Sequence, residues 1–459
     1  MEKSANEDVS RLSNDRASSD LEEQTQLDTK APVNETQSKE ALLIVVGGFC
    51  ALFVSFGWVN ATGFFEAYYQ HDLFPTYSPS TITWISSIGF AFLYLFSFPM
   101  GILIRRIGCR PVLLVGSILH VLGLITMSFS TQYYQLVLSQ GICSGLGSSA
   151  IFYAGVTTVS QWFAKRQAFA IGISASGSSL GGMIFPAMVT ELMPRIGFGW
   201  TVRATTLVIV VLLLIANLVV KDFPQPSPPA APTRSAPQGN AAAEDVKQPT
   251  LAGIVIDAFK SKLFILTTLA GVLFSFGYFV TLILLVTVAT IRGVPNPVYT
   301  LVILNAASFP GRIIPGALAD KFGRYNTMCI MTFISAVFTL ALYLPTQDSG
   351  AFIAYCVLFG FTSASMVFLS PTLVYQISKP YEVGVRIGIL YSLVSFSALF
   401  GAPIGGALLP EITKGLGPSS NYTEPGRWLI LFCGLCQALG CVIFVWTRWA
   451  VAGCKMVRV

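Results

Sequence analysis

Apolar residues recur along the chain in runs separated by short polar stretches. About 20 apolar residues in a helix cross a bilayer core of about 30 Å, so each run is expected to be a membrane helix. The predicted spans are 41–68, 81–104, 111–130, 134–158, 167–190, 200–220, 263–289, 297–319, 325–345, 350–375, 386–409 and 428–450. The pattern predicts an all-α integral membrane protein with twelve transmembrane helices.

Two long polar stretches interrupt this pattern. Residues 1–40 are polar and lack aromatic side chains, which predicts a disordered cytosolic tail. Residues 221–260 are rich in Pro and Ala, which predicts a flexible cytosolic linker, and they end in an amphipathic segment, Leu251–Lys260, expected on the membrane surface. The expected domains are the tail (1–40), a six-helix bundle (41–220), the linker (221–260), a second six-helix bundle (261–451) and a cytosolic C-terminus (452–459).

The composition supports a membrane protein. Hydrophobic residues make up 53% of the chain and charged residues 11%, against roughly a quarter charged in soluble domains. This balance argues against a soluble enzyme, a nucleic-acid binder and a disulfide-stapled secreted protein. Cys433 and Cys436 form a C-x-x-C pair, but it lies inside a predicted helix without a second pair, so neither a metal site nor a cofactor is expected.

Basic residues indicate the orientation. With the tail in the cytosol, seventeen Lys and Arg fall in cytosolic loops and the C-terminus, against five on the opposite face. This bias predicts cytosolic N- and C-termini. The sequon at Asn421 then lies in an outer loop and is a candidate glycosylation site. The plasma membrane is the expected location.

The two predicted bundles repeat one another. Glycines and basic residues recur in order, with one offset of 215 residues and another of 224. The matched sets are Gly101, Arg106 and Gly108 with Gly316, Lys321 and Gly323; Gly145 with Gly360; and Gly177, Gly181 and Gly182 with Gly401, Gly405 and Gly406. Duplicated halves are typical of transporters that rock two bundles around a central site. Because glycine lets helix backbones approach closely, Gly177, Gly181, Gly401 and Gly405 are expected on moving surfaces, with static packing as the alternative.

The loops 101–110 and 316–324 resemble the signature loop of the major facilitator superfamily. Residues 161–182, and Leu304-Asn305 followed by Gly311-Arg312, are similar to the fungal branch of the monocarboxylate-porter family. The resemblance implies two pseudo-symmetric six-helix bundles and secondary active transport of organic acids or related metabolites.

Arg312 is the main candidate for substrate binding. An ionisable group inside a membrane helix costs about 2.5–3.5 kcal/mol on insertion scales, so it usually faces a cavity or a partner. The family resemblance implies that this arginine binds the substrate carboxylate, and its planar fork suits that contact. The alternative is a structural arginine bonded to backbone carbonyls. The similar animal lactate carriers place an aspartate where Ser308 stands and a lysine near Val59, so their route of proton coupling is not expected here.

Glu66 and Asp320 are candidates for coupling and gating. Glu66 lies near the outer end of the first span and is a candidate carrier of a coupling proton, with an interfacial carboxylate as the alternative. His120 is expected to be a packing residue. Asp320 belongs to the second signature loop and is expected to face a neighbouring helix N-terminus or a basic side chain and hold the inward gate, whereas Arg105 reverses the charge in the first loop.

Polar and aromatic residues on the inward helices complete an expected pocket for an amphipathic, partly aromatic anion. They are Asn60, Tyr68, Tyr153, Asn305 and Tyr391. Each alone is more often a packing residue than a ligand contact.

These features predict a secondary transporter, functional as a monomer in membrane lipid, that moves a small organic anion by alternating access. Efflux of a fungal secondary metabolite is one form of this function, and import of a vitamin or carboxylate nutrient is the alternative. A non-transporting nutrient sensor is the alternative of a different class. No nucleotide-binding motif or catalytic cluster is present in the sequence, so an enzyme is not expected.

Overall fold

The computed structural model describes residues 35–163, 166–222, 250–345, 348–379, 382–408 and 426–453. Most of the predicted tail, residues 223–249 of the linker, the sequon at Asn421 and the C-terminal residues from 454 lie outside this part of the chain. The expectations for those segments stay predictions.

The N-terminal half is a helical bundle. Its elements are α2 (Glu35–Val54), α3 (Phe56–Asn60), α4 (Thr62–Tyr68), the π-helical turn η1 (Tyr69–Leu73), α5 (Pro79–Leu95), α6 (Ser97–Ile107), α7 (Cys109–Met127), α8 (Tyr133–Leu136), the π-helical turn η2 (Val137–Cys143), α9 (Ser144–Trp162) and α10 (Gln167–Val219). The first predicted span is divided into α2, α3 and α4, so α3 is a short helix inside a membrane crossing.

The C-terminal half is a second bundle. Its elements are α11 (Leu251–Lys260), α12 (Lys262–Ile291), α13 (Val298–Phe322), α14 (Arg324–Val337), the π-helical turn η3 (Phe338–Tyr343), α15 (Ser349–Gln376), α16 (Val383–Leu408) and α17 (Arg427–Ala452). The predicted amphipathic segment coincides with α11.

The twelve predicted crossings are present as eleven long apolar helices in the described part of the chain, because α10 contains two of them. At 53 residues, α10 is more than twice the length that a bilayer core requires. Gly197 interrupts it with φ 76° and ψ 168°, a backbone conformation that side chains with a Cβ rarely adopt. The bend leaves two arms, each long enough to cross.

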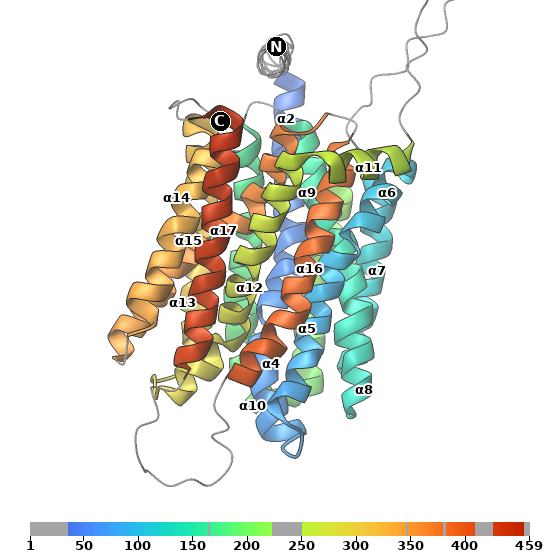
Figure 1. Cartoon of the computed structure of the whole chain (residues 1–459). Coiled ribbons are helices and arrows are strands. Elements are labelled where there is room, and N and C mark those ends of the chain that lie inside the picture. The colour runs from blue at the N-terminus through green and yellow to red at the C-terminus, as the bar shows by residue number, and fades with distance from the viewer. Residues whose placement is uncertain are drawn as a thin grey trace, which may run out of the picture.

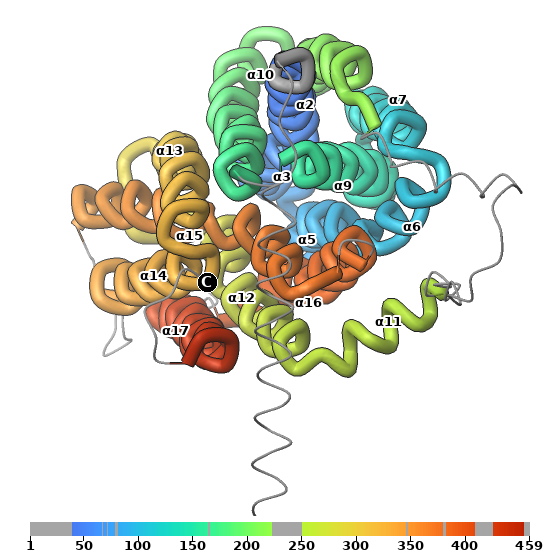
Figure 2. Tube along the Cα trace, turned by 90° about the horizontal axis from the view of Figure 1, so that it is seen from above, coloured from blue at the N-terminus to red at the C-terminus, as the bar shows by residue number. Residues whose placement is uncertain are grey.

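The two halves stand side by side with their long helices aligned (Figures 1 and 2). Helices α10 and α13 pack against each other across the boundary between the halves, and α16 packs on α5 and α6. At the top of Figure 1, α11 lies across the ends of the long helices. We call this end of the molecule the linker face and the opposite end the far face.

The four glycines expected on moving surfaces pack inside the halves. A Cβ at Gly177 or Gly181 would lie 2.3 or 2.4 Å from the carbonyl oxygens of Phe49 and Phe53, both on α2. A Cβ at Gly401 or Gly405 would meet side chains of α12, 3.1 and 2.7 Å away. Their close approach is therefore to helices of the same half, and movement at these surfaces stays a prediction.

Different glycines allow the halves to approach each other. A Cβ at Gly172 would lie 2.5 Å from the carbonyl oxygen of Arg312, and one at Gly316 would lie 2.6 Å from that of Ala168. On the other side of the boundary, a Cβ at Gly388 would lie 2.8 Å from the Cα of Phe98. These crossings require glycine because the opposing atoms are backbone and cannot rotate away.

Asp222 takes a role that the sequence did not suggest. Its carboxylate accepts a 2.5 Å hydrogen bond from the backbone N–H of Cys109 at the start of α7. Gly108, with φ 89°, leaves room for this carboxylate. In the first signature loop, the carboxylate that bonds the helix N-terminus is therefore that of Asp222, at the end of the N-terminal half. Arg105 of the same loop is exposed.

Candidate functional site

Arg312 lies where the two halves meet. Its side chain projects from α13, is only 2% exposed and reaches α10 of the other half. Nη1 donates hydrogen bonds to the carbonyl oxygen of Ala175 (2.9 Å) and to Oγ of Ser178 (2.5 Å). The guanidinium carbon lies 4.7 Å from the ring centre of Phe368, which places the charge over an aromatic face.

No carboxylate neutralises this guanidinium among the described residues. The three ion pairs found there involve other residues, and Nε of Arg312 has no hydrogen-bond partner. An unpaired buried charge is costly unless something else compensates it. The single bond to a backbone carbonyl is what a structural arginine would make, whereas the unpartnered Nε and the missing carboxylate favour an anionic ligand.

Aromatic rings from both halves surround this position. Contacts across the boundary join Phe56 with Phe368 (6.0 Å between ring centres), Phe90 with Phe279 (5.5 Å), and Tyr94 with Tyr391 (5.4 Å). We call the set the aromatic collar: Phe56, Phe90, Tyr94, Phe152, Phe279, Phe368 and Tyr391. All seven are buried, so the site offers flat apolar surfaces beside one positive charge.

Three further predicted site residues lie at the boundary. Asn60 on α3 donates a long hydrogen bond (3.4 Å) to Oδ1 of Asn305 on α13, which links the two halves. Tyr391 belongs to the aromatic collar, and its hydroxyl donates to the carbonyl oxygen of Val367 (2.9 Å). The structure therefore brings Asn60, Asn305 and Tyr391 to the same boundary as Arg312.

The two remaining tyrosines have other surroundings. The hydroxyl of Tyr153 donates to the carbonyl oxygen of Gly384 near the start of α16, so it joins the halves rather than facing an open pocket. Tyr68, near the far face, stacks on Phe198 at 5.4 Å inside the N-terminal half. Tyr68 is not part of the aromatic collar, and its role as a substrate contact stays a prediction.

Asp320 faces a helix N-terminus, as its position in the signature loop suggested. Its two carboxylate oxygens accept hydrogen bonds from the backbone N–H groups of Ala168 (3.2 Å) and Phe169 (2.8 Å) in the first turn of α10. A carboxylate is favourable at this end of a helix because the unpaired N–H groups point toward it. The contact joins α13 to α10 at the linker face.

We expect Asp320→Asn to weaken this contact and expose the first turn of α10. Hydrogen bonds to charged groups contribute about 1.5–3 kcal/mol each, and an amide oxygen can replace only part of the carboxylate. A cysteine introduced at Ala168 reports the change, and its thiol labelling should become roughly tenfold faster or more. Asp257→Asn, on the exposed side of α11, is the matched control and should leave labelling unchanged. Equal labelling in both variants would contradict a holding role for Asp320.

Glu66 is buried, with 3% exposure, beside the hydroxyl of Ser86 on α5. This position does not match a carboxylate in open interfacial water, which was the alternative.

His120 has three hydrogen-bonding neighbours at Nδ1, namely Oγ of Ser144 (3.0 Å), Oγ of Ser148 (3.0 Å) and the Ser144 carbonyl (3.2 Å). These contacts agree with a packing histidine.

Comparison with known proteins adds a family match. The family model described as "Major Facilitator Superfamily" matches residues 47–345 and 306–453, which together cover most of the chain. The two matches overlap over residues 306–345, in α13, α14 and η3.

Several fungal proteins are similar over nearly their whole length. The "MFS-type transporter 1" of Ophiocordyceps sp. (strain BCC 1869) is 38% identical over 91% of this chain and 87% of its own length. The "Fujikurins efflux protein" of Gibberella fujikuroi is 34% identical over 91% of this chain and 84% of its own. The "Agnestins efflux protein AgnL12" of Paecilomyces divaricatus is 31% identical over 92% and 90%.

Proposed function

Because the chain belongs to the major facilitator superfamily and is a multi-pass membrane transporter, we propose that it exports a small organic anion by alternating access. Its relatives are transporters rather than enzymes, and two of them are named efflux proteins for fungal metabolites. Those names support export as the direction here. The monocarboxylate-porter branch is part of the same proposal and rests on the motif around Arg312.

The surroundings of Arg312 support a carboxylate as the class of substrate. Arg312 is a buried guanidinium at the boundary of the halves, without a carboxylate partner among the described residues and surrounded by aromatic rings. A carboxylate ligand would satisfy the free donors of its planar fork, and flat rings would pack against an aromatic or otherwise unsaturated body. The proposed substrate is therefore a metabolite with one carboxylate and a flat apolar part.

The contacts at the boundary support a rocking mechanism. In the present arrangement the halves are joined at the linker face by Asp320 with α10 and by Tyr153 with Gly384. Ser392 adds a link at the level of the aromatic collar, since its hydroxyl donates to the carbonyl oxygen of Leu95 (2.7 Å). Release of these few contacts would let the halves separate at this end, so that Arg312 becomes reachable. The energy must come from a solute or ion gradient, and a proton gradient is the proposed source.

The proposed placement follows from the orientation of the basic loops. The linker face is assigned to the cytosol and the far face to the outside, with the plasma membrane as the location and a monomer as the functional unit. Asn421 is then an outer glycosylation site. Protease protection of an epitope at each end would check the orientation.

The function is tested by comparing small molecules inside cells and in the medium, with and without this protein. We expect a carboxylated metabolite to accumulate inside when the protein is missing, which would also identify the substrate. A compound left unused in the medium would show import of a nutrient instead. No difference under several growth conditions would favour a non-transporting sensor and overturn the proposal.

A further inference from the structure

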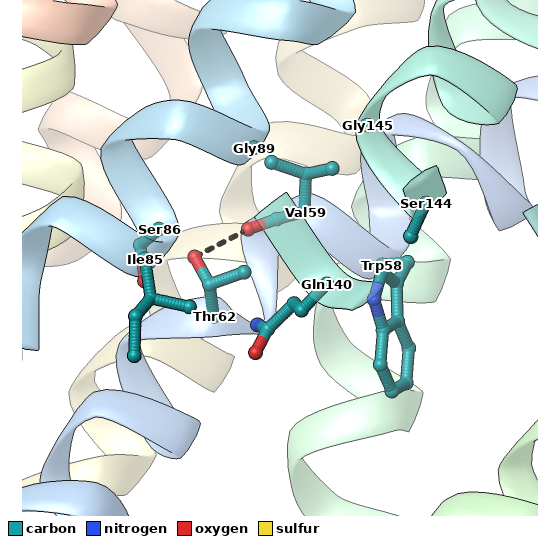
Figure 3. A pocket seen from close by; sticks show the side chains of 9 residues that line it. All are labelled: Trp58, Val59, Thr62, Ile85, Ser86, Gly89, Gln140, Ser144 and Gly145. Atoms are coloured by element: carbon teal, nitrogen blue, oxygen red, sulfur yellow. Dashed lines mark hydrogen bonds between the residues drawn. The ribbon is translucent and has the colours of Figure 1, made fainter. Parts of the chain in front are cut away.

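A small cavity lined by both apolar and polar residues lies inside the N-terminal half, apart from Arg312. It has a volume of about 10 Å³ and is lined by residues of α3, α4, α5, η2 and α9 (Figure 3). The lining residues that carry polar side chains are Trp58, Thr62, Ser86, Gln140 and Ser144. This volume corresponds to about one water molecule, provided that polar partners are present.

Unsatisfied polar groups gather around this cavity. Trp58 Nε1, Ser86 Oγ and Gln140 Nε2 are buried and have no hydrogen-bond partner among the described residues. Buried polar groups are nearly always hydrogen-bonded, so three such atoms around one cavity point to a bound ligand. Other lining groups are occupied: Thr62 donates to the carbonyl oxygen of Val59, and Ser144 contacts His120.

Glu66 extends this cluster by one residue. Its carboxyl group lies beside Ser86, which lines the cavity, and its Oε1 also has no hydrogen-bond partner among the described residues. The cluster therefore contains one acid, one hydroxyl group and two N–H donors.

The donor set distinguishes between possible ligands. A metal cation would be repelled by the N–H groups of Trp58 and Gln140, which are donors only. Glu66 itself does not line the cavity, and Ser86 lies between them. The oxygen atom of a water molecule can accept from both N–H groups and donate a hydrogen to Oγ of Ser86. The chemistry of the cavity thus fits a water molecule that Ser86 connects to the acid.

We propose that Glu66 and one water molecule in this cavity form a proton-binding site in the N-terminal half, separate from the substrate site at Arg312. A proton from the solvent reaches the Glu66 carboxylate through this water and the Ser86 hydroxyl, each of which gives up one proton as it accepts another. Glu66 becomes a neutral carboxyl group and releases the proton to the solvent in the reverse step. Its use as the coupling site rests on the transport function proposed above.

The groups facing Glu66 fit a proton site. The elements packed against α4 are α3, α5, α12 and η1. From η1 the phenol of Tyr69 faces the acid, and its hydroxyl donates to Oε1 of Gln140 (2.7 Å), whereas the carboxylate of Asp72 on η1 is exposed. The titratable residues of α5 and α12 are Tyr94, Tyr278 and Lys262; the two tyrosines lie around Arg312, and Lys262 begins α12 at the linker face. Beyond Ser144 the network ends at His120.

The short helix α3 connects this site with the substrate site. Phe56 of α3 lies in the aromatic collar, with its ring centre 5.9 Å from the guanidinium carbon of Arg312. Two residues later, Trp58 lines the cavity. Ser55 and Ala61 flank α3 with right-handed helical backbone angles, and their N–H groups bond to Ala51 and Trp58, so α3 stays hydrogen-bonded to the helices on either side. Proton binding and substrate binding would each bias the position of α3.

The site is tested by infrared titration of the purified full-length protein without substrate. We expect a carbonyl band of a protonated carboxyl group that titrates in the wild type and is lost in Glu66→Gln. Glu191→Gln is the matched control, because Glu191 is exposed near the middle of α10, and it should keep the band. Should Glu66→Gln fail to fold, Trp58→Phe and Ser86→Ala must shift the band. A band that none of these variants alters would overturn the proposal.

Transport assays separate this proposal from the proposed function. In proteoliposomes with the substrate identified in cells, Glu66→Gln should still exchange substrate but should no longer respond to an imposed pH gradient. Arg312→Ala should lose both activities and keep the infrared band. A pH response that persists in Glu66→Gln would overturn the coupling role, while loss of transport in both variants with normal bands would point to the substrate site alone.

Discussion

Arg312→Ala abolishes transport while leaving the protein folded in the membrane, and Arg312→Lys restores little of it; this is the largest functional effect that we expect. Lysine keeps the charge but offers a compact ammonium group in place of the planar fork. It cannot hold Ala175 and Ser178 while also binding both oxygens of a carboxylate. Each lost charged hydrogen bond costs about 1.5–3 kcal/mol, so flux should fall by roughly tenfold to a hundredfold in the lysine variant.

The chain offers a matched control for this variant. Arg203 also lies over an aromatic ring, 4.3 Å from the centre of Phe129, and donates to a serine, Ser128, at 3.1 Å. It is in the N-terminal half and does not reach the aromatic collar. Arg203→Lys should therefore transport normally. Normal flux in Arg312→Ala, measured at equal amounts of folded protein by size-exclusion chromatography, would refute the substrate role.

Gly172→Ala has the second large expected effect, because it prevents the present closure of the linker face. The added Cβ would lie 2.5 Å from the carbonyl oxygen of Arg312, a distance that requires α10 and α13 to separate. Gly316 lies at the same crossing and is packed as closely against the opposite backbone, so a shift of one helix along the other does not make room for the methyl group. We expect at least a tenfold loss of transport, with faster labelling of a cysteine at Ala168, at the linker end of the same arm of α10.

The control for Gly172→Ala is another glycine in a long helix. A Cβ at Gly406 of α16 meets no atom within 4 Å, so Gly406→Ala should have no effect on flux or labelling. This control removes the general effect of adding a methyl group to a membrane helix. Wild-type flux and labelling in Gly172→Ala would show that the linker face closes without the close crossing.

The positions of the membrane helices could be predicted from the sequence because each depends on a local run of apolar residues. Runs of apolar residues, with Pro-rich and charged breaks between them, marked every crossing and the amphipathic helix α11. The repeated signature loops pointed to the family. The two spans predicted at 167–190 and 200–220 correspond to the two arms of α10, which the non-helical backbone of Gly197 separates.

The site was predicted only in part. Arg312 stood out because a charge inside an apolar run is rare, and Asp320 because it belongs to a loop motif. The aromatic collar was missed apart from Tyr391, since aromatic residues are frequent in all the helices and only the packing shows which ones converge. The role of Asp222 and the cavity near Trp58 were missed for the same reason: the residues that meet there are distant in the sequence.

The residues that flank the connection between the halves are held by hydrogen bonds. Before it, Asp222 is bonded to Cys109 and Lys221 to Glu40; after it, Thr250 caps the first turn of α11. These contacts do not involve residues 223–249, so a changed composition or an insertion in that stretch leaves them in place. Added tags or longer segments there are therefore expected to cost little in the stability of either bundle.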